Sequence, residues 1–269
     1  MTHKFGIRSQ EQPEKQNVIV DWGDGNITKL ADQTISGGYY YISHTYKNNG
    51  KYIIKIFGNT YFAIAQGQAF AYLDVNDPNI LCRAFDVDLP VASHLKNLSS
   101  FCINANHLIN VNIPAAFNSS HINNLSCTFF GCRNLLKVTG LPSTNKYNFQ
   151  YSGVFRECPN LQYTDLSMIH IGYGGWAWMF AGCNKLSINI EDIFYYPFYT
   201  KDQEININSI FLNCYNLSGV VPADKLWNNK DVKWLNTSKA FSGCSGLIDQ
   251  IPSSWGGTAS DDIIEKSVE

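Results

Sequence analysis

Five of the eight cysteines in the chain recur within one short phrase, which places a phenylalanine three residues before the cysteine and a leucine three residues after it. These marker cysteines are Cys132, Cys158, Cys183, Cys214 and Cys244. Regularly spaced thiols can ligate zinc, form disulfides, act as nucleophiles or fill space in a core. The choice among these roles decides what kind of protein the sequence encodes.

Zinc is the sharpest chemical alternative for the thiols. Structural zinc sites use two pairs of cysteine or histidine ligands, each pair separated by about two to four residues. Cys127 and Cys132 are separated by four residues, but no second pair follows at a finger-like distance. The other marker cysteines come one at a time, 25 to 31 residues apart. The sequence therefore predicts no zinc site among the cysteines, and we expect no cofactor.

Disulfides between the marker cysteines are compatible with distance but not with direction. Neighbouring strands lie about 4.8 Å apart, within the roughly 4.4–6.8 Å Cα range of a disulfide. Equivalent residues of parallel repeats, however, point their Cβ atoms the same way, and five markers would leave one unpaired. Ala105 holds the cysteine place in an earlier, related phrase, which favours small size over thiol chemistry. We expect buried, unpaired thiols; Cys82, Cys102 and Cys127 fall outside this spacing and stay unassigned.

The phrase DWGDGN suggests calcium, because Asp21 and Asp24 carry the hard oxygen ligands that this ion prefers. An EF-hand loop needs an oxygen ligand at its third position and a distal Glu, whereas Gly23 stands third here and that Glu is missing. The alternative is a tight turn, in which Asp side chains accept backbone N–H bonds and glycines adopt positive φ. We favour the turn, and calcium binding stays open.

Catalytic motifs are missing from the sequence. The six histidines form no HExxH pair, and no GxSxG, P-loop or dinucleotide-binding fingerprint is present. Paired carboxylates of a glycan-active enzyme are not readable from a sequence, because their separation is three-dimensional. We expect a protein without catalytic residues, and a glycan-active enzyme is the weakest alternative.

Internal repetition supplies the elements that position the cysteines. Counting the phrase around Ala105 and Leu108, six related units follow one another. After the leucine, Val111 and Ile113 alternate with asparagines, as in a half-buried strand. Before each cysteine, one aromatic residue among small ones predicts a short helical or 3-10 turn. A repeat of this length with recurring leucine is typical of a leucine-rich-repeat solenoid.

The F-x-x-C-x-x-L phrase, followed by L-x-x-V-x-I-P, resembles the bacterial surface leucine-rich repeats called BspA-type. The resemblance covers residues 69–257, with irregular strands after Cys158 and Cys183 and an inserted phrase, IEDIFYYPFYT. It implies a solenoid of about six rungs that offers a surface for binding. Its markers are Phe129, Cys132, Leu135, Phe155, Cys158, Leu161, Phe180, Cys183, Leu186, Phe211, Cys214, Leu217, Phe241, Cys244 and Leu247.

Residues 1–68 differ from the repeats. The phrases VIVDW, YYYISHTY and KYIIKIFG predict strands, and GDGN, SGG and KNNG predict turns between them. WGDG, HTY and G-x-Y-x-x-x-I resemble the polycystic-kidney-disease-type immunoglobulin-like domain, which implies a reduced sandwich acting as a spacer or adhesion module. The matching residues are Trp22, Gly23, Asp24, Gly25, His44, Thr45, Tyr46, Gly50, Tyr52 and Ile56.

The expected fold class is therefore a small all-β immunoglobulin-like sandwich at residues 1–68, followed by a leucine-rich-repeat solenoid at 69–257 and a polar tail at 258–269. Composition limits the function of such a chain. Charged residues make up 16% and the net charge is −2, which argues against a nucleic-acid partner. No apolar run is long enough for a transmembrane helix, and the first residues lack the apolar region of a signal peptide.

These observations favour a bacteriophage virion surface protein: a fibre, decoration or receptor-recognition component. The pairing of an immunoglobulin-like module with repeats resembles proteins of phage and prophage genomes. A bacterial cell-surface or secreted adhesin is the alternative, although no export signal or anchor is visible. The expected partners are a protein or glycan on a cell surface, or neighbouring virion proteins, without nucleic acid or membrane insertion; a homo-oligomer is compatible. The candidate contact residues are Tyr195, Tyr196, Phe198 and Tyr199, which could instead cap the core or face a neighbouring subunit.

Overall fold

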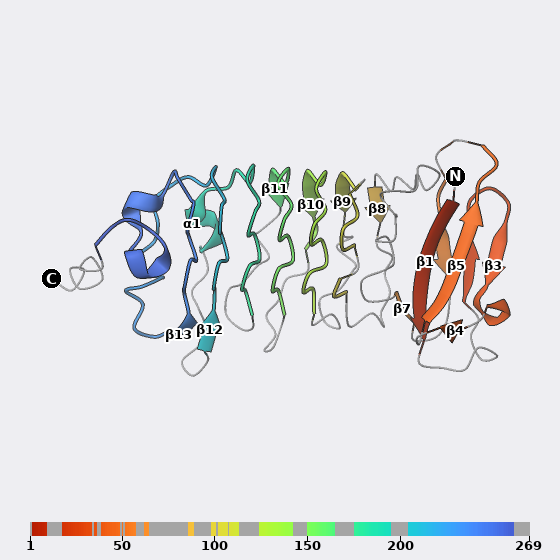
Figure 1. Ribbon diagram of the computed structural model, residues 1–269, viewed down its shortest axis with the longest axis horizontal. Helices are drawn as coiled ribbons and strands as arrows, with labels where there is room; N and C mark the ends of the chain where they lie inside the picture. Colours follow the sequence, from red (N-terminus) through yellow and green to blue (C-terminus); the bar gives the residue numbers. More distant parts are fainter. Residues whose placement is uncertain are drawn as a thin grey trace.

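The structure is a computed structural model of the 269-residue chain. Its antiparallel strands lie at one end and its parallel strands follow along the long axis (Figure 1). The described residues are 2–9, 18–33, 35–36, 39–48, 50, 52–57, 62–64, 86–88, 98–100, 102–106, 108–112, 124–141, 150–164, 175–194 and 204–260. The boundary expected after residue 68 lies outside them.

Antiparallel strands between residues 2 and 64 form two small sheets, with the strand orders β4-β5-β1-β7 and β3-β2-β6. The β-branched and aromatic phrases supply these strands, and the GDGN turn joins β2 to β3. The bounds are β1 Thr2–Ser9, β2 Ile19–Asp21, β3 Ile27–Lys29, β4 Ile35–Ser36, β5 Tyr39–Thr45, β6 Lys55–Phe57 and β7 Phe62–Ile64, with a 3-10 helix at Leu30–Asp32.

Both antiparallel sheets contribute to one buried cluster. It includes Val20 of β2 and Ile42 of β5, together with Trp22 and Tyr46. The indole Nε1 of Trp22 donates to Thr28 Oγ1 at 2.8 Å, and the hydroxyl of Tyr46 donates to the Trp22 carbonyl oxygen at 2.9 Å. These bonds satisfy polar atoms whose burial would otherwise cost free energy.

Parallel strands occupy the repeat region. One sheet has the order β11-β10-β9-β8, and β12 pairs separately with β13. Val111 of β9 lies opposite Val138 of β10; both are buried, whereas Asn110 and Lys137 beside them are exposed. The alternation expected after the leucine is therefore confirmed at β9. The bounds are β8 Asp86–Asp88, β9 Asn110–Asn112, β10 Lys137–Thr139, β11 Tyr163–Thr164, β12 Glu204–Asn206 and β13 Lys233–Asn236.

The segment before each marker cysteine consists of two β-turns. In one unit, the Thr128 N–H donates to the Leu125 carbonyl at 3.0 Å and the Cys132 N–H to the Phe129 carbonyl at 3.2 Å. The third residue of each turn has positive φ, the sign pattern of a type II turn. The first left-handed column contains Ser100, Cys127, Gly153, Trp178, Ser209 and Lys239; the second left-handed column contains Asn104, Gly131, Glu157, Gly182, Asn213 and Gly243.

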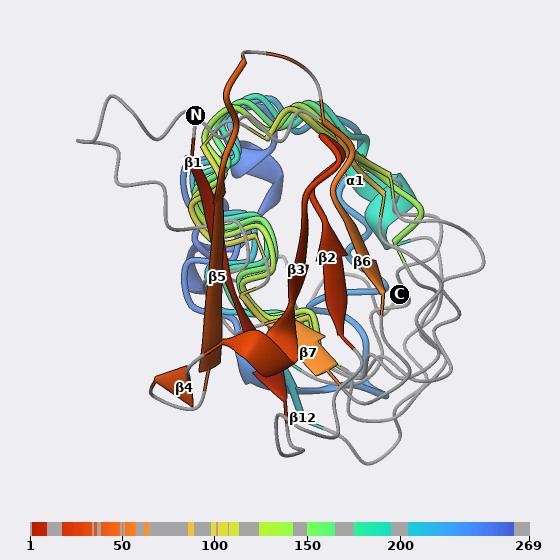
Figure 2. The same cartoon turned by 90° about the vertical axis from the view of Figure 1, so that its right-hand side faces the viewer.

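Backbone hydrogen bonds join consecutive turn segments, whose traces overlay when viewed along the long axis (Figure 2). Alternate N–H groups of one unit donate to carbonyl oxygens of the next. At one junction the bonds run from Leu125 to Gln150, Cys127 to Ser152, Phe129 to Val154 and Gly131 to Arg156, at 2.8–2.9 Å. The equivalent positions donate at the other junctions between residues 98 and 242. The repeat spacing thus brings equivalent residues into register.

The phenylalanines of the repeated phrase form a buried stack. Ring centroids are 5.5 Å apart for Phe129–Phe155 and Phe155–Phe180, 5.6 Å for Phe180–Phe211 and 5.4 Å for Phe211–Phe241. Trp255 continues the stack, 6.5 Å from Phe241. The burial expected for the marker thiols is confirmed, since all five belong to the core cluster of the repeat region, together with Phe180 and Leu186.

The expected fold class is nevertheless wrong. The described strands lie in four small sheets, two antiparallel and two parallel, rather than in one sandwich followed by one solenoid. The helical or 3-10 turn expected before each cysteine is absent from the described units, because two left-handed residues per unit interrupt the right-handed backbone that a helix requires. The described helices are α1 at Ile190–Ile193 and short 3-10 turns, including Ile248–Gln250 and Ser253–Trp255.

Candidate functional site

The five marker thiols share one environment. Each Sγ donates a hydrogen bond to a backbone carbonyl oxygen of the preceding unit. The accepting residue stands at the phenylalanine position of that unit. The S···O distances are 2.9 Å for Cys132 to Cys102 and Cys158 to Phe129, 3.0 Å for Cys183 to Phe155 and Cys214 to Phe180, and 3.1 Å for Cys244 to Phe211. Since a carbonyl has two lone pairs, it accepts the thiol in addition to its backbone N–H donor.

Burial makes these thiols poor nucleophiles. It raises the pKa of Cys244 to about 12 and the pKa of Cys183 still further. The pKa values of Cys158 and Cys214 are raised well above the ordinary value for the same reason, with neighbouring thiols adding to the effect. A thiol that stays protonated neither attacks an electrophile nor ligates a metal readily. We therefore assign the marker thiols a structural role in the core rather than a chemical one.

Two of the unassigned cysteines now have places. Cys102 is buried where later units carry phenylalanine, and burial raises its pKa well above the ordinary value. Its position three residues before Ala105 was a readable signal. Cys127 stands in the first left-handed column and is half-buried; burial raises its pKa, and the positive charge of Arg156 offsets part of that rise. Cys82 lies outside the described residues.

The DWGDGN loop is a tight turn, as expected. Asp21 Oδ1 accepts the Gly23 N–H at 2.9 Å and Asp24 Oδ1 accepts the Asn26 N–H at 3.1 Å. Gly23 and Gly25 have φ of 75° and 89°. A Cβ at Gly23 would lie 2.6 Å from the Ile53 carbonyl oxygen, so only glycine fits there. Both Asp side chains are thus used within the turn.

His44 packs against aromatic rings in the antiparallel region. Its ring stacks on Trp22 with centroids 5.1 Å apart and meets Tyr46 edge-on at 4.7 Å. His44 Nε2 lies 2.7 Å from Asp24 Oδ2. Desolvation raises the pKa of the Asp24 carboxyl, but hydrogen bonds from His44 and Asn26 outweigh it and hold the pKa below its ordinary value.

Neither a metal centre nor a membrane span is found in the described part of the chain. Within it, no group of three or more His, Cys, Asp and Glu side chains gathers closely enough to hold a metal ion. No helix among the described residues combines the length and apolarity needed to cross a membrane.

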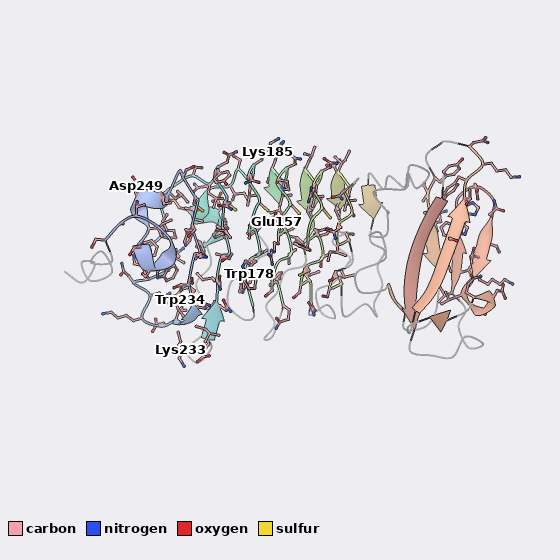
Figure 3. The ribbon with its side chains drawn as sticks, viewed as in Figure 1. Glu157, Trp178, Lys185, Lys233, Trp234 and Asp249 are labelled. Carbon is pink, nitrogen blue, oxygen red and sulfur yellow. The ribbon has the colours of Figure 1, made fainter. Side chains whose placement is uncertain are left out.

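On the outward surface of the turns, one cation lies close to two aromatic rings. The Arg156 guanidinium lies 5.5 Å from the ring centroid of Phe130 and 5.5 Å from that of Trp178, within the range of cation–π attraction. Trp178 is 39% exposed, and Glu157 is the residue after Arg156 in the sequence. Figure 3 labels Glu157 and Trp178 in the repeat region. We call Arg156, Glu157 and Trp178 the turn-face cluster.

Comparison with protein-family models, curated proteins and solved structures returns no match. The site is therefore assigned from its own geometry.

Sequence reasoning placed the contact residues elsewhere. Tyr195, Tyr196, Phe198 and Tyr199 lie outside the described residues. The turn-face cluster was missed, although the phrase WAW held a signal for it. Trp176 is fully buried and stacks on Tyr151 at 4.3 Å, whereas Trp178 two residues later faces outward. An extended path of the chain would place residues two apart on the same face, so the opposite faces of Trp176 and Trp178 come from the left-handed turn at Trp178, which was not predicted.

Proposed function

We propose that the protein is a non-catalytic binding protein of a bacteriophage virion surface, and that its repeat region is the interaction surface. One observation carries this proposal: the core positions of the repeats are uniform, whereas the position after the phenylalanine varies in side chain and in exposure, from the exposed Arg156 to the buried Ala181. The buried places hold phenylalanine, cysteine and leucine in the last five units. The residue after the phenylalanine is, in order, Phe130, Arg156, Ala181, Leu212 and Ser242.

Such a division is useful for recognition. A constant core keeps the backbone of each unit in the same place, and variable side chains then give the surface a different chemistry at each step. His44 and the marker thiols support a binding role over catalysis. His44 is packed between aromatic rings, the marker thiols are buried, and burial raises the pKa of Cys158, Cys183, Cys214 and Cys244.

The virion location draws support from composition. Only 16% of the residues are charged, well below the roughly one quarter of an average domain. A polar surface with few charges suits a protein that works outside the cell, where it meets neighbouring coat proteins or a cell-surface receptor. The bacterial surface adhesin is the competing location for the same binding role.

Immunogold labelling tests the location. An antibody raised against the purified protein is applied to phage particles and to intact cells from cultures that carry the gene. We expect gold on the particles at one structural position. Gold on the cell envelope with unlabelled particles would establish the adhesin instead.

Binding to intact bacterial cells tests the role. We expect the fluorescently labelled protein to bind cells saturably and to be displaced by unlabelled protein. The Tyr195→Ala/Tyr196→Ala double variant examines the inserted aromatics, and unchanged binding would remove them from the contact surface. An absence of saturable binding to cells and of gold on particles would refute the proposed function.

A further inference from the structure

Trp178 occupies a backbone position that disfavours it. Its φ is 56°, in the left-handed region that is costly for residues with a Cβ and most unusual for bulky ones. The repeat backbone imposes this conformation throughout the first left-handed column, so the choice of side chain needs an explanation. The column neighbours of Trp178 are Gly153 and the buried Ser209. A glycine would satisfy the backbone better, and tryptophan adds an exposed ring.

The Arg156 guanidinium lies against the Trp178 ring, and its N–H groups can still donate hydrogen bonds. A guanidinium that lies over aromatic rings still directs its N–H groups outward in its own plane. No carboxylate of the described residues lies within ion-pair distance of Arg156. Arg156 therefore offers donors to a ligand beside Trp178.

Glu157, the residue after Arg156 on the same turn, supplies hydrogen-bond acceptors. Its carboxyl group lies 3.2 Å from the position that a Cβ on Gly182 would take, and Gly182 belongs to the same repeat unit as Trp178. Gly182 is the residue that leaves room for this carboxyl group. The turn-face cluster thus combines an aromatic platform, a donor-only cation and an acceptor-only anion on adjacent units.

These three groups match a neutral saccharide. Sugar rings present C–H groups that pack on an indole face, and each hydroxyl both donates and accepts, so it can bind a guanidinium and a carboxylate together. The opposite charges of Arg156 and Glu157 cancel, which disfavours a strongly charged ligand. A protein interface needs about 800 Å² per partner around a buried apolar centre, whereas the column neighbours of Trp178, Gly153 and Ser209, add little apolar surface to its ring.

We propose that Trp178, Arg156 and Glu157 form a binding site for a neutral saccharide. This inference rests on the proposed binding function and names its ligand class. The probe is a printed array of defined neutral and acidic oligosaccharides, followed by calorimetry with the best neutral sugar. We expect the full-length protein to bind neutral sugars on the array and Arg156→Gln to weaken binding.

The decisive variant is Trp178→Gly, because it removes the ring and relaxes the left-handed backbone. We expect at least a tenfold loss of affinity with a thermal midpoint no more than about 4 °C below that of the wild type. Lys239→Gly is the matched control: it makes the same backbone change in the same column, two units away, and should leave sugar binding unchanged.

Two outcomes would overturn the inference. Equal sugar binding by Trp178→Gly and the wild type would remove the site. A wild-type protein that ignores every sugar on the array, yet binds intact cells before and after periodate oxidation of their glycans, would exclude the ligand class while the proposed binding function stands.

Discussion

The thiol of Cys183 donates its hydrogen to the carbonyl oxygen of Phe155, 3.0 Å away in the preceding repeat unit. The same bond recurs at the other marker cysteines, so each of these side chains both fills space and ties one unit to the previous one. Alanine fits the position of the marker cysteine, as the buried Ala105 shows, but it cannot donate this hydrogen bond.

Cys183→Ala should therefore destabilise the repeat region without unfolding it. We expect a loss of about 1–2 kcal/mol, from the missing sulfur contacts and the lost hydrogen bond. Urea unfolding at pH 7 followed by circular dichroism measures it. Cys127→Ala is the control, because that thiol is only half-buried, and it should cost less than about 0.5 kcal/mol. Equal losses of unfolding free energy for the two variants would contradict a special role for the marker cysteines.

Stability should fall at alkaline pH because of the same thiols. The folded pKa of Cys183 is raised by burial, whereas an unfolded thiol titrates near about 8.5. The stabilisation is thus complete below about pH 8.5 and is lost as the pH rises toward the folded pKa. Each such thiol contributes a slope of about 1.4 kcal/mol per pH unit. Unfolding free energies between pH 7 and 11 should fall more steeply for the wild type than for Cys183→Ala, and parallel curves would refute this.

The second left-handed column alternates side chains and glycines: Asn104, Gly131, Glu157, Gly182, Asn213, Gly243. Gly182→Ala should cost about 1–2 kcal/mol, since φ is 79° and the new Cβ meets the Glu157 carboxyl. Glu157→Gly relieves a left-handed residue and should stabilise by up to about 1 kcal/mol. In the Glu157→Gly background the carboxyl group is gone, so Gly182→Ala costs only the strain of its positive φ. The difference between the two backgrounds therefore measures the clash with the carboxyl group. Additive effects in urea unfolding would show that the carboxyl moves aside freely.

Acid should destabilise the antiparallel region through Asp24. Its folded pKa is lowered, chiefly by the His44 hydrogen bond acting against desolvation, so its contribution is present above about pH 3.9 and lost as the pH falls through the lowered value. The urea midpoint of the Trp22 indole resonance should drop between pH 5 and pH 3. Asp24→Asn should be less stable at pH 7 and lose less on acidification. The same drop in both proteins would contradict the assignment.

The repeat register and the core could be predicted from the sequence, because the type of a side chain indicates whether it is buried. Phe180, Cys183 and Leu186 recur at fixed spacing, and the structure buries all three. The DWGDGN turn was equally readable, because Gly23 and Gly25 mark positive φ and Asp accepts local N–H bonds.

Backbone conformation was less readable. Glycine marks only half of the second left-handed column, and residues such as Cys127, Trp178 and Lys239 hold left-handed positions without any local signal. Tertiary bonds to the next unit fix those turns, and a propensity argument within one unit does not contain them. The predicted helical turn failed for that reason, and the exposed face of Trp178 was missed with it.

The turn segments donate their alternate N–H groups in one direction only, toward the C-terminal neighbour. The turn segments therefore have a polarity: the first unit presents its carbonyl oxygens at one end, and the last unit presents its N–H groups at the other. Two copies meeting end to end would have to join head to tail, an arrangement that a two-fold axis cannot generate and that does not close on itself. Phe241, in the last of these units, donates its N–H to the Trp255 carbonyl oxygen at 3.1 Å, so the residues after the repeats cover a donor at that end and such a contact would have to displace them.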